Sequence, residues 1–167
     1  MVWRLNDDPW LFPDPHQGEP DGLLAVGGDL SPDRLLAAYS FGIFPWYGFR
    51  ESPEIMWWCP MDRFVIFPSE VHVSHSMRQL IRSNRYTVSI GSDFNGVIEQ
   101  CSLANRRNEQ PGAWLGDEMK EAYMRLHDLG YATSIEVRDA DSCLVGGLYG
   151  VIIGRNFIGE SMFSLVP

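Results

Sequence analysis

The chain has 167 residues, of which 45% are hydrophobic and 21% are charged, and its formal net charge is −9. This composition is typical of one ordinary domain or two small ones with packed cores, and it argues against intrinsic disorder. No apolar run approaches the roughly 18 residues of a membrane helix, and Asp7 and Asp8 stand where a signal peptide would be apolar, so we expect a cytoplasmic protein.

The N-terminal part of the chain is rich in proline, glycine and tryptophan. Each proline removes a backbone donor and restricts the residue before it, so long helices are disfavoured here. One helix is still predicted, because Ser31 is a good N-cap, Pro32 suits the first helical position and Gly42 is a natural stop. We therefore expect a small irregular domain over residues 1–62.

From Arg63 the pattern changes to an alternation of helices and strands. In chain order, the sequence predicts a strand at 64–67, a helix at 74–83, a strand at 86–90, helices at 93–104 and 118–129, and strands at 132–138, 143–153 and 156–163. Turns at 140–142 and 154–155 join the last three strands. The expected fold class is α+β, with residues 63–167 forming a domain that ends in antiparallel strands.

Charge is distributed unevenly along the chain. Residues 1–60 contain nine acidic residues and three arginines, whereas residues 72–107 contain five arginines and two acidic residues. The acidic total argues against a generic nucleic-acid coat protein. The basic segment suits phosphate, because a guanidinium is a planar fork, although the same fork also suits structural ion pairs.

Two tryptophans are candidates for ligand contacts. Trp46 follows Pro45, and Trp114 follows Gly112 and Ala113, so both lie beside residues that favour turns. An exposed aromatic face can stack an unpaired base. The alternative is that both rings fill gaps in the hydrophobic core.

Glu160 is a carboxylate in the middle of an apolar strand. Such a group is either expelled to solvent or satisfied by partners, because its burial is unfavourable. Glu160 therefore lies either on a solvated face or in a pocket where it meets an ammonium group.

Other signals for chemistry are weak. His72 and His75 form an HxxH pair without a third ligand at suitable spacing, which favours a polar helix start over a metal site. Cys59, Cys101 and Cys143 lie far apart and give no CxxC pair, so we expect reduced, mostly buried thiols. The sequence contains no GxGxxG, GxxxxGK[ST] or GxSxG motif.

Several motifs in a fixed order resemble one known family. They are GLLAVGGDLSP at 22–32, GIFPWY at 42–47, WWCP at 57–60, HVS at 72–74, GGLYGV at 146–151 and GESMFS at 159–164. Together they extend over nearly the whole chain and closely resemble the bacterial leucyl/phenylalanyl-tRNA–protein transferases.

This resemblance implies an aminoacyltransferase. Enzymes of that family move Leu, Phe or Met from aminoacyl-tRNA to proteins that begin with Arg or Lys, which marks the acceptor for degradation. The resemblance also implies a small N-terminal domain followed by a GNAT-like acyltransferase domain, with no metal and no membrane. The [QR]xxGx[GA] loop of acyl-CoA enzymes is absent from the sequence, which agrees with a tRNA donor and no cofactor.

The resemblance also implies roles for particular residues. Trp46 and Trp114 match the pair that holds the terminal adenine of the tRNA. Leu148, where the family often has Met, and Phe157 match the apolar lining of the pocket for the donor side chain. Glu160 matches the glutamate beside the aminoacyl group and is the candidate catalytic residue.

The acidic total is in tension with a tRNA substrate. We therefore expect contact to be confined to the acceptor end of the tRNA. Arg78 and Arg82, within the basic segment, are the expected phosphate contacts.

The chain departs from the family pattern at several points. Ala113 stands where the family usually has Thr, and Thr133 where a His is expected. The family's Asp-x-Gln motif, proposed to activate the attacking amine, would lie beyond Pro167. We therefore expect a domain truncated at its C-terminus, an exposed edge after the last strand, and poor or absent transfer by this polypeptide alone.

Two alternatives to the transferase remain open. A non-catalytic module would bind aminoacyl-tRNA or N-terminal peptides without joining them. An ordinary acetyltransferase is disfavoured by the missing pyrophosphate loop. Product formation separates the transferase from the binding module. Replacement of Trp46 or Trp114 by Ala should weaken tRNA binding by a transferase or a binding module, whereas it should leave the coenzyme A affinity of an acetyltransferase unchanged.

Overall fold

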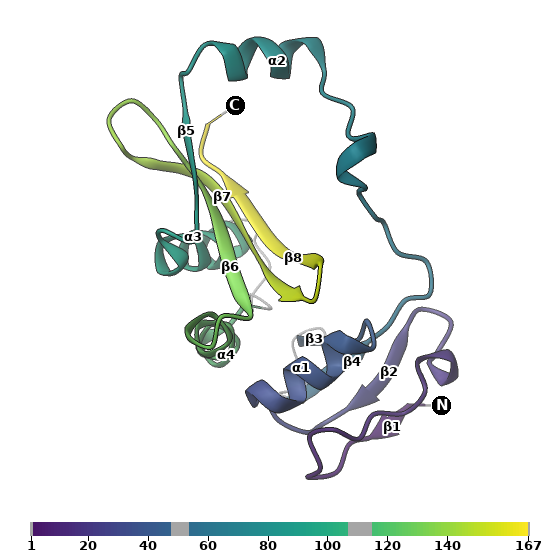
Figure 1. The fold of residues 1–167 in the computed structure, drawn as a ribbon. Coiled ribbons are helices and arrows are strands. Elements are labelled where there is room, and N and C mark those ends of the chain that lie inside the picture. Colours follow the sequence, from purple (N-terminus) through teal and green to yellow (C-terminus); the bar gives the residue numbers. More distant parts are fainter. Residues whose placement is uncertain (1, 48–53, 107–114, 167) are drawn as a thin grey trace.

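The computed structural model describes residues 2–47, 54–106 and 115–166. Within them the chain forms two four-stranded sheets and four α-helices (Figure 1), in agreement with the expected α+β class. The elements are β1 (Trp3–Arg4), the 3₁₀ turn η1 (Pro15–Gln17), β2 (Leu23–Val26), α1 (Pro32–Ser40), β3 (Phe44–Tyr47), β4 (Ile55–Trp58), the 3₁₀ turn η2 (Pro68–Glu70), α2 (His75–Arg82), β5 (Thr87–Ile90), α3 (Phe94–Arg106), α4 (Asp117–Asp128), β6 (Ala132–Arg138), β7 (Leu144–Ile153) and β8 (Asn156–Ser164).

The first sheet consists of short strands in the proline-rich part of the chain. Its order is β1-β2-β4-β3, with β1 parallel to β2 and the other neighbours antiparallel. The expectation of an irregular N-terminal domain is therefore wrong in this respect. Pro45 is tolerated because it lies in β3, at the edge of the sheet, where a missing N–H disturbs the ladder least.

The predicted helix after Ser31 is confirmed as α1. The Ser31 hydroxyl accepts a hydrogen bond from the backbone N–H of Arg34, and Pro32 is the first helical residue. Gly42 follows the helix with a φ of +75°, a left-handed conformation that glycine adopts readily. Tyr39 points from α1 into the core, where it is 3% exposed.

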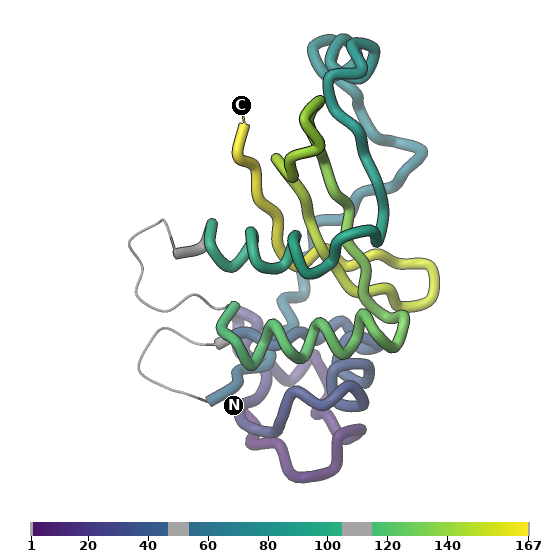
Figure 2. Tube along the Cα trace, turned by 90° about the vertical axis from the view of Figure 1, so that its left-hand side faces the viewer, coloured from purple at the N-terminus to yellow at the C-terminus, as the bar shows by residue number. Residues whose placement is uncertain are grey.

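The second sheet has the order β5-β6-β7-β8, with all neighbours antiparallel. The structure confirms the predicted ranges of α2 to α4 and of β5 to β8 to within two residues at each end. Figure 2 shows α3 and α4 side by side on one face of this sheet. The opposite face includes exposed apolar side chains, among them Val88, Ile90 and Met162.

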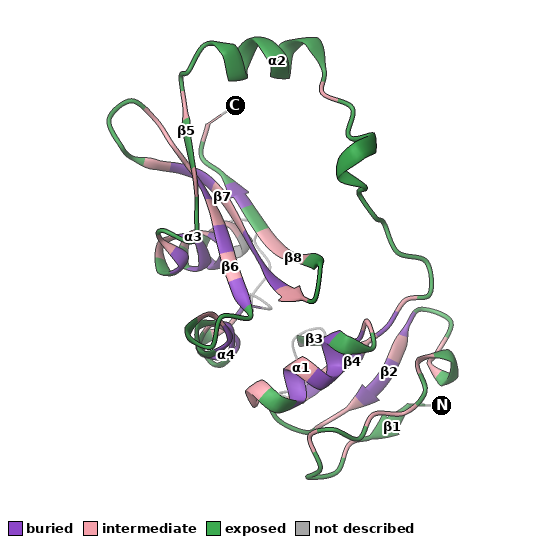
Figure 3. Ribbon diagram, in the orientation of Figure 1, coloured by how far each residue is buried: buried purple, intermediate pink, exposed green. Residues whose placement is uncertain are grey.

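The strand predicted at 64–67 is wrong. These residues have no strand conformation, and Phe64 is 93% exposed. A strand needs a hydrogen-bonded neighbour, and this run pairs with no other described residue. In Figure 3 it belongs to a long exposed connection that includes α2 and joins β4 to β5.

A buried carboxylate joins β5, β6 and α3. Glu136 of β6 is fully buried, and its oxygens accept hydrogen bonds from three serine hydroxyls and one backbone N–H, namely Ser89, Ser92, Ser134 and the amide of Asp93. Burial alone would raise the pKa of Glu136, but these donors lower it to about 2. The group is therefore a charged structural anchor at neutral pH.

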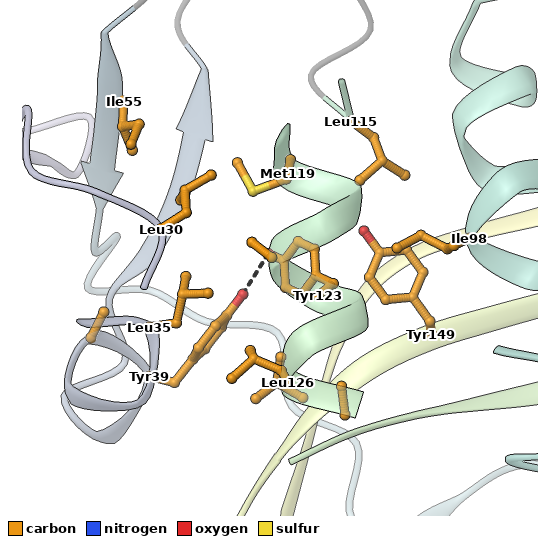
Figure 4. Close-up of a cluster of buried hydrophobic side chains, with 14 of the residues drawn as sticks. Leu30, Leu35, Tyr39, Ile55, Ile98, Leu115, Met119, Tyr123, Leu126 and Tyr149 are labelled. Atoms are coloured by element: carbon orange, nitrogen blue, oxygen red, sulfur yellow. Dashed lines mark hydrogen bonds between the residues drawn. The ribbon is translucent and has the colours of Figure 1, made fainter. Parts of the chain in front are cut away.

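One hydrophobic core extends from the first sheet to the second. Figure 4 shows α1 facing α4, with Tyr39 directed toward Tyr123 and with Leu35 and Leu126 nearby. Tyr123 also packs edge-to-face against Tyr149 of β7, with ring centroids 5.3 Å apart. Because α1 contacts both α4 and β7, the two sheets are held through this helix.

The cysteines and the helix lengths complete the description. Cys59 and Cys101 are buried and Cys143 is exposed, and all three thiols are free. Within the described ranges, each helix is too short or too polar to cross a lipid bilayer.

Candidate functional site

A pocket lies between strand β3 of the first sheet and strand β8 of the second. Its volume is ≈ 270 Å³. Its lining consists of Phe44, Pro45, Trp46, Arg63, Ile158, Gly159 and Glu160. The structure thus brings together Trp46 and Glu160, which are 114 positions apart in the sequence and were singled out for separate reasons.

Trp46 offers an accessible ring to this pocket. Its side chain is 40% exposed, so it does not fill a gap in the core. The ring packs edge-to-face on Trp58, with centroids 6.1 Å apart, and β3 is held in register by pairing of Trp46 with Met56. Trp114, the second tryptophan of the prediction, lies outside the described residues.

Glu160 is the extra residue of a β-bulge. Ser161 pairs with Tyr149 and Gly159 pairs with Gly150, so Glu160 has no partner of its own on β7. A bulge changes the direction of side chains on the bulged strand. As a result, two consecutive residues face the helices. Glu160 reaches Tyr123 of α4, and its neighbour Ser161 lies beside Cys101 of α3.

The hydrogen bonds of Glu160 come from the helical side. The Tyr123 hydroxyl donates to Oε2 of Glu160 at 2.8 Å, and the Tyr39 and Tyr123 hydroxyl oxygens are 2.7 Å apart. Burial raises the pKa of Glu160, whereas hydrogen bonding from Tyr39 and Tyr123 and the charge of Arg63 counteract this rise. The net direction is upward, so this carboxylate holds its proton more strongly than an exposed glutamate does.

Arg63 places a positive charge at the pocket. Its guanidinium lies 5.1 Å from the centre of the Phe44 ring and donates to the carbonyl oxygen of Gly42 at 3.0 Å. Sequence reasoning did not single out Arg63. A detectable signal was the apolar segment around it, since an arginine beside aromatic residues often stacks on one of them.

No polar role of Tyr39 or Tyr123 was predicted from the sequence, since both fit the buried faces of their helices. A buried tyrosine normally needs a partner for its hydroxyl, and this need was the available signal. Two tyrosines on the buried faces of two helices indicate a polar contact between those helices. The structure shows that contact and its extension to Glu160.

Leu148 and Phe157 do not line this pocket. In β7, Gly147 and Tyr149 face the helices, so Leu148 between them belongs to the opposite face of the sheet. Phe157 pairs with Ile152 on that opposite face, and its ring is where a Cβ on Gly150 would lie. The two predicted donor-pocket residues are thus near each other, across the edge strand β8 from Trp46.

Arg78 and Arg82 are exposed on α2. Figures 1 and 2 show α2 at the end of the molecule opposite to α1 and β3. A ligand that contacts both the pocket and these arginines must therefore extend along the second sheet. His72 and His75 lie at the exposed start of the same helix, and the described residues contain no cluster of three or more potential metal ligands.

The arrangement combines three kinds of recognition in one pocket. The Trp46 ring offers a face for stacking, Glu160 offers a partly buried acceptor, and Arg63 offers a cation. This set suits a planar aromatic group attached to a part that carries an amine. Among the described lining residues there is no thiol, serine or histidine that would act as a nucleophile.

Comparison with known proteins gives one consistent family. Residues 65–167 match the family model described as leucyl/phenylalanyl-tRNA protein transferase, and residues 28–61 match the model of the N-terminal domain of the same family. A leucyl/phenylalanyl-tRNA–protein transferase of Maridesulfovibrio salexigens is 50% identical over 100% of this chain and 68% of its own length. Proteins of the same name from Thermodesulfovibrio yellowstonii and Anaeromyxobacter dehalogenans are 50% and 51% identical over 99% of this chain, and 66% and 69% of their own lengths. The chain thus spans about two thirds of the length of these relatives.

Proposed function

The chain belongs to the leucyl/phenylalanyl-tRNA protein transferase family, a family of aminoacyltransferases, and on this premise we propose that it moves Leu, Phe or Met from aminoacyl-tRNA to proteins. The proposed acceptor is the free α-amine of a protein that begins with Arg or Lys, which the added residue marks for degradation in the cytoplasm. The observation that carries the proposal is the pocket in which Trp46 and Glu160 meet.

The proposed reaction needs no cofactor. The acceptor nitrogen attacks the carbonyl carbon of the donor ester, and a peptide bond forms as the bond from that carbon to the ribose oxygen breaks. The amine loses one proton, and the ribose oxygen of the released tRNA gains one. Because the donor is already activated as an ester, the protein's main task is to position the two substrates.

The pocket residues have distinct proposed tasks. Trp46 stacks on the terminal adenine of the tRNA, a contact worth about 1–3 kcal/mol. Glu160 accepts a hydrogen bond from the α-amino group of the donor residue. Arg63 limits the accumulation of negative charge where Glu160 and the tRNA meet.

Leu148 and Phe157 are proposed to contact the donor side chain. They lie on the other face of the sheet from Trp46, so the aminoacyl group would pass the outer edge of β8 to reach them. Apolar contacts of this kind discriminate by size, by about 1–3 kcal/mol per methylene group. Replacement of Phe157 by Ala is therefore expected to alter the preference between Leu and Phe donors.

The proposed domain division places a small domain at 1–62 and a GNAT-like acyltransferase domain at 63–167. An antiparallel sheet with α3 and α4 on one face supports this division. Arg78 and Arg82 are proposed to contact tRNA phosphates at a distance from the pocket.

A transfer assay tests the proposal. The protein is incubated with labelled Phe-tRNA and a peptide that begins with Arg, and label in the peptide is measured. The matched peptide has an acetylated N-terminus and therefore no free α-amine. Binding of the charged tRNA is measured in parallel for the parent protein, for Trp46→Ala and for Trp10→Ala, since Trp10 is 59% exposed and lies outside the pocket.

Three results are distinguishable. The transferase is supported if label enters only the peptide with a free N-terminus. It also requires that Trp46→Ala binds the tRNA at least about tenfold more weakly and that Trp10→Ala binds it as tightly as the parent protein. Binding that depends on Trp46 without any product favours the non-catalytic binding module. Absence of both binding and product contradicts the proposal.

A further inference from the structure

Three side chains form a chain of hydrogen bonds that ends at the pocket. Tyr123 donates its hydroxyl proton to Oε2 of Glu160 at 2.8 Å. The Tyr39 and Tyr123 hydroxyl oxygens are 2.7 Å apart, and either hydroxyl can donate in this contact. Tyr39 also hydrogen-bonds the Glu160 carboxylate, so both tyrosines act on the same group.

This chain of hydrogen bonds connects three elements from distant parts of the sequence. Tyr39 belongs to α1, Tyr123 to α4 and Glu160 to the bulge of β8. Tyr39 is 3% exposed and Tyr123 is fully buried, and Figure 4 shows their side chains directed toward each other. Burial raises the pKa of both phenols well above the ordinary value, so both remain proton donors at physiological pH.

The neighbouring Tyr149 provides a contrast. Its ring packs against Tyr123, but its hydroxyl is buried without a hydrogen-bond partner among the described residues. The hydrogen bonds to Glu160 therefore come from Tyr39 and Tyr123 and are not a general property of this aromatic cluster. In the part of the chain that the structure describes, the titratable and charged groups around Glu160 are Tyr39 on α1, Tyr123 on α4, Tyr149 on β7 and Arg63 in the connection after β4.

We propose that Tyr39 and Tyr123 are positioning residues for aminoacyl transfer, which hold the Glu160 carboxylate in place as the acceptor for the donor's α-amino group. The proposal rests on the proposed function. A bulged residue lacks the ladder contacts that fix its neighbours, and the tyrosine chain supplies the missing restraint. A hydrogen bond donated by Tyr123 stabilises the ionised carboxylate. The two tyrosines therefore also favour the ionised form of Glu160, which accepts hydrogen bonds. Neither tyrosine lines the pocket, so each acts through Glu160.

The first test is independent of catalysis. The Glu160 carboxyl carbon is observed by NMR during a pH titration of the ¹³C-labelled protein and of three variants, Tyr123→Phe, Tyr39→Phe and Tyr149→Phe. We expect Tyr123→Phe and Tyr39→Phe each to raise the pKa of Glu160, because each removes a hydrogen bond to the carboxylate, and Tyr149→Phe to leave it unchanged. An unchanged Glu160 titration in folded Tyr123→Phe would overturn the proposal, and if that variant does not fold, Tyr39→Phe decides in the same way.

The second test measures transfer as a function of pH. We expect kcat/KM at neutral pH to fall about tenfold in Tyr123→Phe, which is the effect of losing one hydrogen bond to a charged group. The acidic limb of the pH profile moves to higher pH in this variant but not in Tyr149→Phe. A loss of activity without movement of the limb would reduce Tyr123 to a merely structural role and overturn the proposal.

The two tests separate this inference from the proposed function. If the parent protein neither binds the charged tRNA nor transfers its aminoacyl group, the proposed function fails, while the NMR titration still reports whether the tyrosines control Glu160. If transfer occurs but neither the titration nor the limb responds to Tyr123→Phe, the function stands and the positioning role is refuted.

Discussion

Gly150 of β7 faces Gly159 of β8, yet the two glycines have opposite surroundings. A Cβ atom added to Gly150 would clash with the carbonyl oxygen of Ile158 and with the ring of Phe157. A Cβ atom added to Gly159 would meet nothing within 4 Å. The space beside Gly150 is therefore filled by β8, whereas the space beside Gly159, which lines the pocket, is empty.

This contrast predicts opposite effects of the same substitution. We expect Gly150→Ala to lower the free energy of unfolding by about 2–3 kcal/mol, because backbone atoms of β8 must shift to admit the methyl group. Gly159→Ala is the matched control and should change stability by less than about 1 kcal/mol. Urea unfolding of both variants measures the difference, and equal losses would show that the packing at Gly150 is not the limiting contact.

The raised pKa of Glu160 predicts a pH-dependent gain from Glu160→Gln. Burial raises the pKa above the model-peptide value of 4.5, so the folded protein binds this proton more strongly than the unfolded chain. As pH rises from 4.5 through the raised pKa, the ionising carboxylate therefore reduces stability. Glutamine does not ionise, so the variant should melt at a higher temperature than the parent protein at pH 7.

Calorimetry between pH 4 and pH 8 checks this prediction. The difference between Glu160→Gln and the parent protein should shrink toward zero as pH falls to 4.5. A difference that stays constant over the whole range would mean that ionisation of Glu160 is not its cause.

Glu136 is expected to behave in the opposite way. Its pKa is lowered from 4.5 to about 2 by the hydroxyl and amide donors around it, despite its burial. The stabilisation is complete above pH 4.5 and is lost as pH falls toward 2. Glu136→Gln should therefore lose roughly 2–3 kcal/mol at pH 7, and this loss should disappear near pH 2 in denaturant titrations at several pH values.

The arginines of α2 predict a change in salt dependence. Charge reversal of Arg78 and Arg82 to Glu should weaken tRNA binding and flatten the plot of log affinity against log salt concentration by about one unit per arginine. Arg125→Glu on α4 is the control, since Arg125 lies outside the basic segment. An unchanged slope in the double variant would show that this basic face is only solvated.

Much of the second sheet was predictable because its local signals agree with one another. The alternation over β6, between Gly130 and the turn at 140–142, gave both ends of that strand. In α4, the apolar residues Met119, Ala122, Tyr123 and Leu126 recur at helical spacing, and the structure buries all four. The run at 64–67 has the same apolar character, but strand formation depends on a partner strand, which a local pattern does not reveal.

The site was predictable only in part. Trp46 and Glu160 were each identified, but nothing local indicates that β3 and β8 border one pocket. The bulge was also hidden, because GESMFS has the composition of a regular strand. Tyr39 and Tyr123 escaped notice because their helical spacing explains them fully as core residues, and only the tertiary contact between α1 and α4 adds their polar role.

The bulge adds one residue to β8 without changing which side chains pack into the core. Ile158 on one side of Glu160 and Phe163 on the other both pack into the core, although they are five positions apart and a strand alternates its faces with a period of two. Removal of Glu160 would leave these two anchors four positions apart, so a regular strand would keep both on the core face. The extra residue is therefore needed to bring a carboxylate to the pocket, and its deletion should spare the packing of β8 while it removes that group.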